Sequence, residues 1–209
     1  MLGDLHQSNL VIVARMFFGI VGTGFAYTGS YEYALISLMI SAVMNVYAFD
    51  IAGQFQQDDR QLSFGIELEV LADFVSFGLL PACLLLSVNQ ANIWSIIGFA
   101  VYLLAVAIRL AHFNRPADYQ DVDYDDQNQY LGLPLLAVAP VLPVVFLLSY
   151  VLPLNIFAWI LIAIMIVLAA AYVIAKPIPM LRKDYMTYTV FGTIAMIVIY
   201  ILLSIFVTK

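Results

Sequence analysis

The chain has 209 residues, of which 64% are hydrophobic and only 11% are charged, and its mean hydropathy is +0.98. A water-soluble domain of this length cannot bury that much apolar surface, so the composition excludes an ordinary soluble protein and indicates a membrane protein. The formal net charge of −6 also excludes a basic nucleic-acid binder.

Apolar segments of about 20 residues, long enough to cross a hydrocarbon core as helices, recur along almost the whole chain. We predict seven such spans, at residues 10–28, 31–50, 64–87, 92–112, 131–151, 154–175 and 187–207. They lack the two-residue alternation of a membrane β-barrel, and backbone polar groups in lipid must be satisfied within a segment, so helices are expected. The sequence therefore predicts an all-α polytopic bundle that forms one integral membrane domain over residues 1–209.

The basic residues between the predicted spans fall on alternate connections. The second connection contains Arg60, the fourth contains Arg115, and the sixth contains Lys176, Arg182 and Lys183, whereas the odd-numbered connections contain none. Because Lys and Arg accumulate in cytoplasmic loops, we expect the N-terminus and the even-numbered connections to be cytoplasmic. Polar groups near these connections would then face the cytoplasm at a prokaryotic plasma membrane.

Four acidic residues lie inside or at the edge of the predicted spans, where an ionisable group needs a partner, a cavity or a function. They are Asp50, at the end of the second span, and Glu67, Glu69 and Asp73 in the third. On a helix, Gly65, Glu69 and Asp73 share one face with about 6 Å between successive positions, whereas Glu67 points elsewhere. Because the second span ends where the third begins, Asp50, Glu69 and Asp73 could converge.

This group of carboxylates has two interpretations. Two carboxylates one turn apart repel each other unless a cation lies between them or one is protonated, and oxygen-rich sites suit Mg²⁺ or Mn²⁺. Alternatively, the acids lie close enough to the membrane surface to be hydrated or paired with Arg60. Arg15 and Arg109, in the first and fourth spans, could likewise bind a substrate or pair with acids.

Three stretches of the chain resemble a known enzyme family. Residues 64–78, with the sequence FGIELEVLADFVSFG, are similar to the second half of the signature D-x2-D-G-x2-A-R-x8-G-x3-D-x3-D of the CDP-alcohol phosphatidyltransferases, in the form typical of their phosphatidylserine synthase branch. RLAHFN at 109–114 and YLGLP at 130–134 resemble two further stretches of that branch, and Asn9 and Arg15 match the spacing of its first helix. The resemblance implies a family-like core over residues 9–183 and an additional C-terminal helix at 187–207.

The first half of the signature is degenerate. The first Asp would fall near Tyr47, the third is replaced by Glu69, and the Gly and the Ala-Arg pair of the signature are absent. Asp50 could stand for the second Asp, although it lies one residue too far from Gly65. Only Gly65 and Asp73 keep the residue types of the family, so the differences are concentrated in the half that would bind the nucleotide.

The resemblance implies transfer of a phosphatidyl group from CDP-diacylglycerol to L-serine or a related alcohol, with release of CMP. Asp73 would be the general base, and Asp50, Glu69 and Asp73 would hold Mg²⁺ or Mn²⁺. The substrate pocket of the expected homodimer would include Gly65, Arg109, Asn114 and Gly132.

Two other functions compete with this one. The chain could be a catalytically impaired relative that keeps the fold as a lipid-binding or partner-binding membrane subunit, which the incomplete acid set favours. A transporter is less well supported, because the acids lie near one membrane face and the spans include no pair of broken helices.

Overall fold

The computed structural model describes residues 6–89, 92–113, 129–174, 176–179 and 183–206. Its helices are α1 (Leu10–Tyr27), α2 (Tyr31–Ala52), α3 (Asp59–Asp73), α4 (Leu80–Val88), α5 (Ile93–Phe113), α6 (Val138–Phe146), α7 (Leu154–Val173) and α8 (Lys183–Phe206). Two three-residue strands, β1 (Gln129–Leu131) and β2 (Pro177–Pro179), form an antiparallel pair. The predicted helical bundle is confirmed, and within the described residues six helical segments are long and apolar enough to cross a membrane.

The third span is longer than its apolar sequence predicts. Helix α3, a π-helical turn at Phe74–Leu79 and helix α4 follow one another without a break over Asp59–Val88. These 30 residues extend for about 45 Å at the rise of an α-helix, which exceeds the hydrocarbon core of about 30 Å. Asp73 lies near the middle of the segment, where α3 meets the π-helical turn.

The fifth predicted span, residues 131–151, is shorter in the structure. Its first residue belongs to β1, and α6 is a nine-residue helix between 3-10 turns at Leu135–Ala137 and Leu147–Tyr150. Pro143 lies inside α6, where it has no backbone N–H to donate to the helix. The helical stretch Leu135–Tyr150 is thus apolar but shorter than the six long segments.

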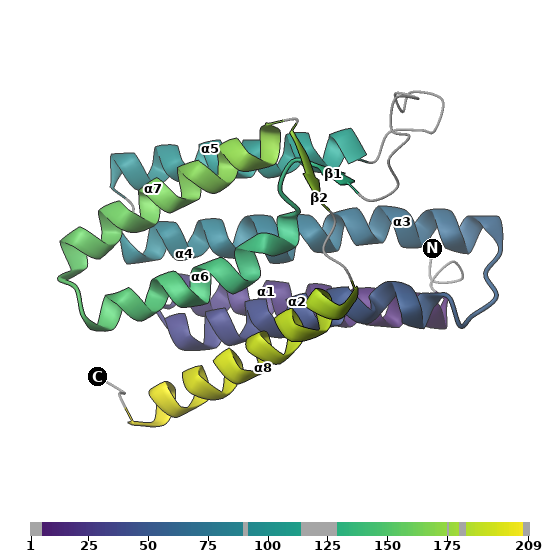
Figure 1. Cartoon of the computed structure of the whole chain (residues 1–209), viewed down its shortest axis with the longest axis horizontal. Coiled ribbons are helices and arrows are strands. Elements are labelled where there is room, and N and C mark those ends of the chain that lie inside the picture. The colour runs from purple at the N-terminus through teal and green to yellow at the C-terminus, as the bar shows by residue number, and fades with distance from the viewer. Residues whose placement is uncertain (1–5, 90–91, 114–128, 175, 180–182, 207–209) are drawn as a thin grey trace.

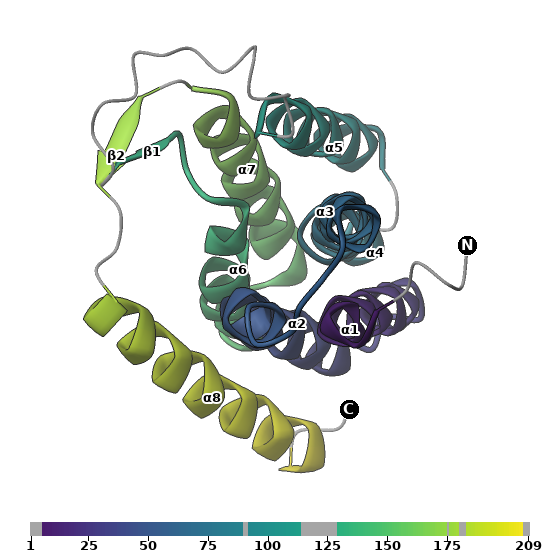
Figure 2. The same cartoon turned by 90° about the vertical axis from the view of Figure 1, so that its right-hand side faces the viewer.

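The long segment α3–α4 lies at the centre of the bundle. Figure 2 shows it between α5 and α1, with α6 and α7 along one side. Fully buried side chains come from several of these helices, among them Leu84, Tyr102, Leu142 and Leu161. Helix α8 lies on the outside against α2, and the Tyr200 hydroxyl donates a hydrogen bond of 2.6 Å to the Pro143 carbonyl.

The two ends of the bundle carry different connections. The start of α1, the connection between α2 and α3, and the β1–β2 pair lie at one end, whereas the α1–α2 and α6–α7 connections lie at the other (Figure 1). The α2–α3 connection and the β1–β2 pair, which belong to the second and sixth connections, therefore lie at the same end. The cytoplasmic placement of the first end stays a prediction.

Candidate functional site

The predicted acidic face of the third span is present on α3. Helix α3 begins with a capping box, in which the Asp58 carboxylate accepts from the Gln61 backbone N–H and the Gln61 side chain accepts from the Asp58 backbone N–H. Gly65, Glu69 and Asp73 then follow on successive turns. Gly65 is buried and lies so close to Asn9 that an added Cβ would be 2.7 Å from the Asn9 amide oxygen.

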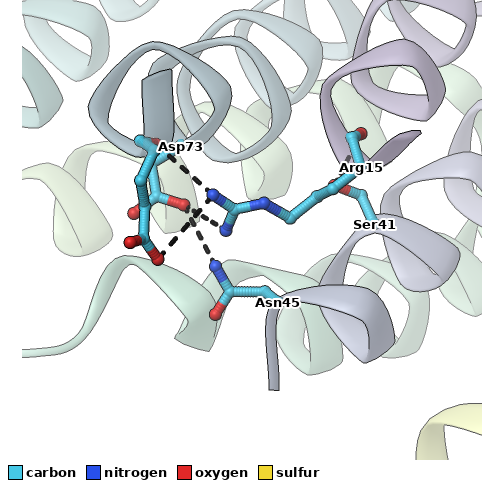
Figure 3. A network of polar contacts seen from close by, with 5 residues as sticks. Arg15, Ser41, Asn45 and Asp73 are labelled. Atoms are coloured by element: carbon cyan, nitrogen blue, oxygen red, sulfur yellow. Dashed lines mark hydrogen bonds and ion pairs between the residues drawn. The ribbon is translucent and has the colours of Figure 1, made fainter. Parts of the chain in front are cut away.

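Arg15 of α1 lies against these carboxylates. Its side chain is fully buried, and Nη1 donates a hydrogen bond of 2.7 Å to Oδ1 of Asp73, whose side chain is 23% exposed. Nη2 lies 3.4 Å from the Glu69 carbonyl and 4.0 Å from Oε1 of Glu69, whose side chain is 50% exposed. Figure 3 shows the guanidinium directed at α3. The alternative that Arg15 pairs with an acid is therefore confirmed, and its partner is Asp73.

Two residues of α2 complete this network, and sequence reasoning did not identify them. The Asn45 amide donates a hydrogen bond of 3.1 Å to the same Oδ1 of Asp73 (Figure 3). The Ser41 hydroxyl donates a hydrogen bond of 3.3 Å to the Arg15 carbonyl. The available signal was the polar series Ser37, Ser41 and Asn45, which recurs every four residues along an otherwise apolar helix. That face of α2 is directed at α1 and α3.

The helix changes its hydrogen-bond pattern immediately after Asp73. The π-helical turn Phe74–Leu79 widens the helix there. The Tyr102 hydroxyl of α5 donates a hydrogen bond of 2.6 Å to the Phe77 carbonyl. Ser76 in this turn packs against Gly19 of α1 so closely that an added Cβ on Gly19 would be 2.4 Å from the Ser76 Oγ. Single π-helical turns inside α-helices occur often at functional sites, and here the turn follows the central carboxylate.

Arg109 and Gly132, both predicted to form the substrate pocket, lie together in the structure. The Arg109 guanidinium donates to the carbonyls of Tyr172, at 3.1 Å, and Gly132, at 3.5 Å, and it lies 4.6 Å from the centre of the Phe113 ring. Gly132 has a φ of 72°, a conformation that favours glycine, and an added Cβ would lie 2.8 Å from Nη1 of Arg109. Arg109 thus joins α5 to α7 and to the segment that follows β1.

A cavity connects the two groups of polar residues. It has a volume of about 260 Å³, and its polar lining residues are Asn45, Asp73 and Arg109. The rest of its lining is apolar and consists of Phe77, Leu110, Phe113, Pro134, Leu135 and Leu136. Asp73 and Arg109, 36 residues apart in the sequence, therefore line the same small space.

The described side chains do not by themselves fit a divalent ion. Within the described residues, no group of three or more Asp, Glu, His or Cys side chains converges, and Oδ1 of Asp73 already accepts two hydrogen bonds. Asp50 lies in the last turn of α2, but its side chain lies outside the described part of the chain, as does all of Asn114. Glu67 is exposed on another face of α3, as predicted. Metal binding by Asp50, Glu69 and Asp73 stays a prediction.

The chain is similar to two known proteins. Both come from strains of Helicobacter pylori and are named CDP-diacylglycerol–serine O-phosphatidyltransferase. Each is 30% identical over 135 residues, which are 63% of this chain and 53% of the relative. The match thus spans about half the length of the relatives, and no family profile matches the chain. These two relatives confirm the predicted resemblance to the phosphatidylserine synthase branch of the CDP-alcohol phosphatidyltransferases.

Proposed function

We propose that the chain transfers a phosphatidyl group from CDP-diacylglycerol to L-serine or a related small alcohol, and that CMP is released. The observation that carries the proposal is Asp73, a carboxylate that is held by a buried guanidinium and lines a cavity. The names of the two relatives support the donor and the acceptor. Phospholipid biosynthesis also agrees with a chain made almost entirely of membrane helices.

Asp73 is suited to accept a proton from the hydroxyl group of the acceptor. Arg15 holds the carboxylate in place, because its Nη1 donates a hydrogen bond of 2.7 Å to Oδ1. Both hydrogen bonds that fix the carboxylate end on Oδ1, and within the described residues no donor bonds Oδ2. One oxygen would therefore orient the side chain while the other takes the proton.

The proposed reaction is a substitution at phosphorus. The acceptor oxygen forms a bond to the phosphorus that carries the diacylglycerol, the bond from this phosphorus to the oxygen of the CMP group breaks, and the hydroxyl proton passes to Asp73. The residues of this chain would orient and deprotonate the acceptor, with Asn45 and Arg15 holding the base in place. Gly65 would allow α3 to approach the start of α1 closely, because it has no side chain to collide with Asn9.

The cavity has properties expected for a small polar acceptor. It combines a carboxylate, an amide and a guanidinium with six apolar side chains in about 260 Å³. A volume of this size suits a small alcohol better than the whole donor lipid, whose chains would lie along the apolar surface that faces the membrane. We propose that the site faces the cytoplasm, in agreement with the distribution of basic residues.

The proposal is tested by measuring CMP release. Purified protein in detergent would be mixed with CDP-diacylglycerol and either serine, glycerol or inositol, with Mg²⁺, with Mn²⁺ or with a chelator. We expect CMP release that is fastest with serine, is abolished by Asp73→Asn and is unchanged by Glu67→Gln. The second substitution is a matched control, because Glu67 lies on the same helix but is exposed on another face.

The same assay separates the proposal from its alternative. If the wild-type protein releases no CMP with any acceptor or ion, while CDP-diacylglycerol still binds, the chain is a lipid-binding relative without the transferase activity. Release of CMP that is equally fast in Asp73→Asn would contradict the assignment of the base. Comparison of the chelator with the two metal ions would test the predicted requirement for Mg²⁺ or Mn²⁺.

A further inference from the structure

A buried cation of the chain itself already lies at the two carboxylates of α3. The Arg15 side chain has no exposed surface, and its two terminal nitrogens contact Oδ1 of Asp73 and the carbonyl of Glu69. The nearest oxygen of the Glu69 carboxylate lies 4.0 Å from the same guanidinium. The positive charge thus lies at Glu69 and Asp73, two of the three carboxylates that the sequence predicts as metal ligands.

This arrangement satisfies the electrostatic requirement of the carboxylate pair. Glu69 and Asp73, one helical turn apart, repel each other unless a positive charge is close to both. The guanidinium supplies that charge, and it cannot dissociate because it is covalently part of α1. The Ser41 hydroxyl binds the Arg15 carbonyl, which fixes this part of α1 against α2. A divalent ion that approached Asp73 would also meet the positive charge of Arg15, which repels it.

We propose that Arg15 is a positioning residue that acts as the permanent counter-cation of Glu69 and Asp73, and that it excludes a divalent ion from Asp73. The inference goes beyond the transferase function and holds whether or not the chain transfers phosphatidyl groups. It concerns Asp73 alone and leaves open a metal ion held elsewhere at this end of the bundle. Its test is therefore ion binding rather than activity.

The experiment is a titration of the purified full chain with Mn²⁺. The concentration of free Mn²⁺ is measured at each step by electron paramagnetic resonance. We expect the wild type and Asp73→Asn to bind Mn²⁺ equally, because the positive charge of Arg15 repels the ion from Asp73. Arg15→Gln should tighten binding by about tenfold or more, since it removes a unit charge a few ångströms from the ion. The gain should disappear in the double variant Arg15→Gln with Asp73→Asn.

Arg15→Lys is the matched control, because it keeps the positive charge on a side chain of similar length, and it should bind Mn²⁺ as the wild type does. The proposal is overturned if the wild type binds Mn²⁺ in an Asp73-dependent manner, or if folded Arg15→Gln binds it no more tightly. If Arg15→Gln does not fold, the wild type is compared with Asp73→Asn alone. Weaker Mn²⁺ binding by Asp73→Asn would then overturn the proposal. A failure of CMP release would not affect any of these outcomes.

Discussion

The pair formed by Arg15 and Asp73 joins a fully buried guanidinium to a partly exposed carboxylate. A guanidinium with no exposed surface has lost its hydration, so its stability in the folded state depends on its partners. Those partners are the Asp73 carboxylate, the Glu69 carbonyl and, at 4.0 Å, the Glu69 carboxylate, all on α3. The pair therefore connects the proposed role of Asp73 to the packing of α1 on α3.

Asp73→Asn should destabilise the fold because it removes the closer of the two charged partners of the buried Arg15. We expect the free energy of unfolding in detergent to fall by about 3 kcal/mol, the lower end of the range for a broken buried ion pair, since Asp73 is partly exposed. Glu67→Gln should change it by less than about 0.5 kcal/mol, as is usual for an exposed position. Equal losses in both variants would contradict the importance of the pair.

A double-mutant cycle would isolate the pair itself. Combining Arg15→Gln with Asp73→Asn removes both charges, so the double variant should be less destabilised than the sum of the single variants by about 1–3 kcal/mol. Additive losses would show that the two side chains do not interact in the folded protein.

A second residue-scale prediction concerns the contact between α1 and the π-helical turn. Gly19→Ala would bring a Cβ within 2.4 Å of the Ser76 Oγ and 3.0 Å of its Cα. We expect it to cost about 1–3 kcal/mol, as overpacking does. Gly24→Ala on the same helix meets no atom within 4 Å and should be neutral or stabilise by up to about 1 kcal/mol. A chemical unfolding series in detergent would compare them, and a loss as large for Gly24→Ala as for Gly19→Ala would refute the explanation.

The chemistry of single residues was only partly predictable. The spacing of Glu69 and Asp73 placed both on one face of a helix, because a helical period depends only on local sequence. The partners of Asp73 come from α1 and α2, 58 and 28 residues away, and no local pattern states which of the polar residues on those helices will meet it. The choice of Arg15 rather than Arg60 follows from how the helices pack.

At the scale of elements, the π-helical turn changes the path of the central segment next to Asp73. A π-helical turn leaves a backbone carbonyl without its usual partner, and the Tyr102 hydroxyl binds the carbonyl of Phe77. The contact also joins α5, which carries Arg109, to the segment that carries Asp73. The relative position of the two polar groups of the cavity therefore depends on it.

Tyr102→Phe should test this dependence. Removing the hydroxyl leaves the buried Phe77 carbonyl without that donor, which we expect to cost about 1–3 kcal/mol of unfolding free energy. Tyr27→Phe, at a tyrosine that is 86% exposed, is the control and should cost less than about 0.5 kcal/mol. Denaturant unfolding of the two variants would be compared with wild type, and a neutral Tyr102→Phe would show that the turn is stable without this bond.

The long helices could be predicted from the sequence because each is a continuous apolar run. The predicted length of the fifth span was wrong. An apolar sequence does not reveal that Gly132 has a positive φ, or that Pro143 lies inside α6 without a backbone N–H to donate. The β1–β2 pair was not predicted either. Its strands are three residues long, contain two prolines, and are far apart in the chain, so neither composition nor period indicates them.

At the scale of the whole molecule, the two ends of the bundle differ in charge and in chemistry. Arg60 in the first turn of α3, Lys176 directly before β2, the acidic face of α3 and the cavity all belong to the half that contains the start of α1 and the β1–β2 pair. The distribution of basic residues predicts that this half faces the cytoplasm. A cytoplasmic site would have direct access to soluble acceptors such as serine.

Cysteine labelling in cells would test this orientation. In a Cys83→Ala background, Val151→Cys places a thiol in the α6–α7 connection, where the side chain is 81% exposed, and Gln56→Cys places one in the exposed α2–α3 connection. A membrane-impermeant maleimide should label Val151→Cys in intact cells, and Gln56→Cys only after permeabilisation. The opposite pattern would place the site on the outer face of the membrane.

The most direct test of the proposed function is the transfer of labelled serine into lipid. Purified wild-type protein, supplied with CDP-diacylglycerol and radiolabelled serine, should form a labelled phospholipid in equal amount to the CMP released. Asp73→Asn should form none, and Glu67→Gln should match the wild type. Wild-type protein that binds CDP-diacylglycerol but forms no labelled lipid with serine would contradict the assignment of this chain as a serine phosphatidyltransferase.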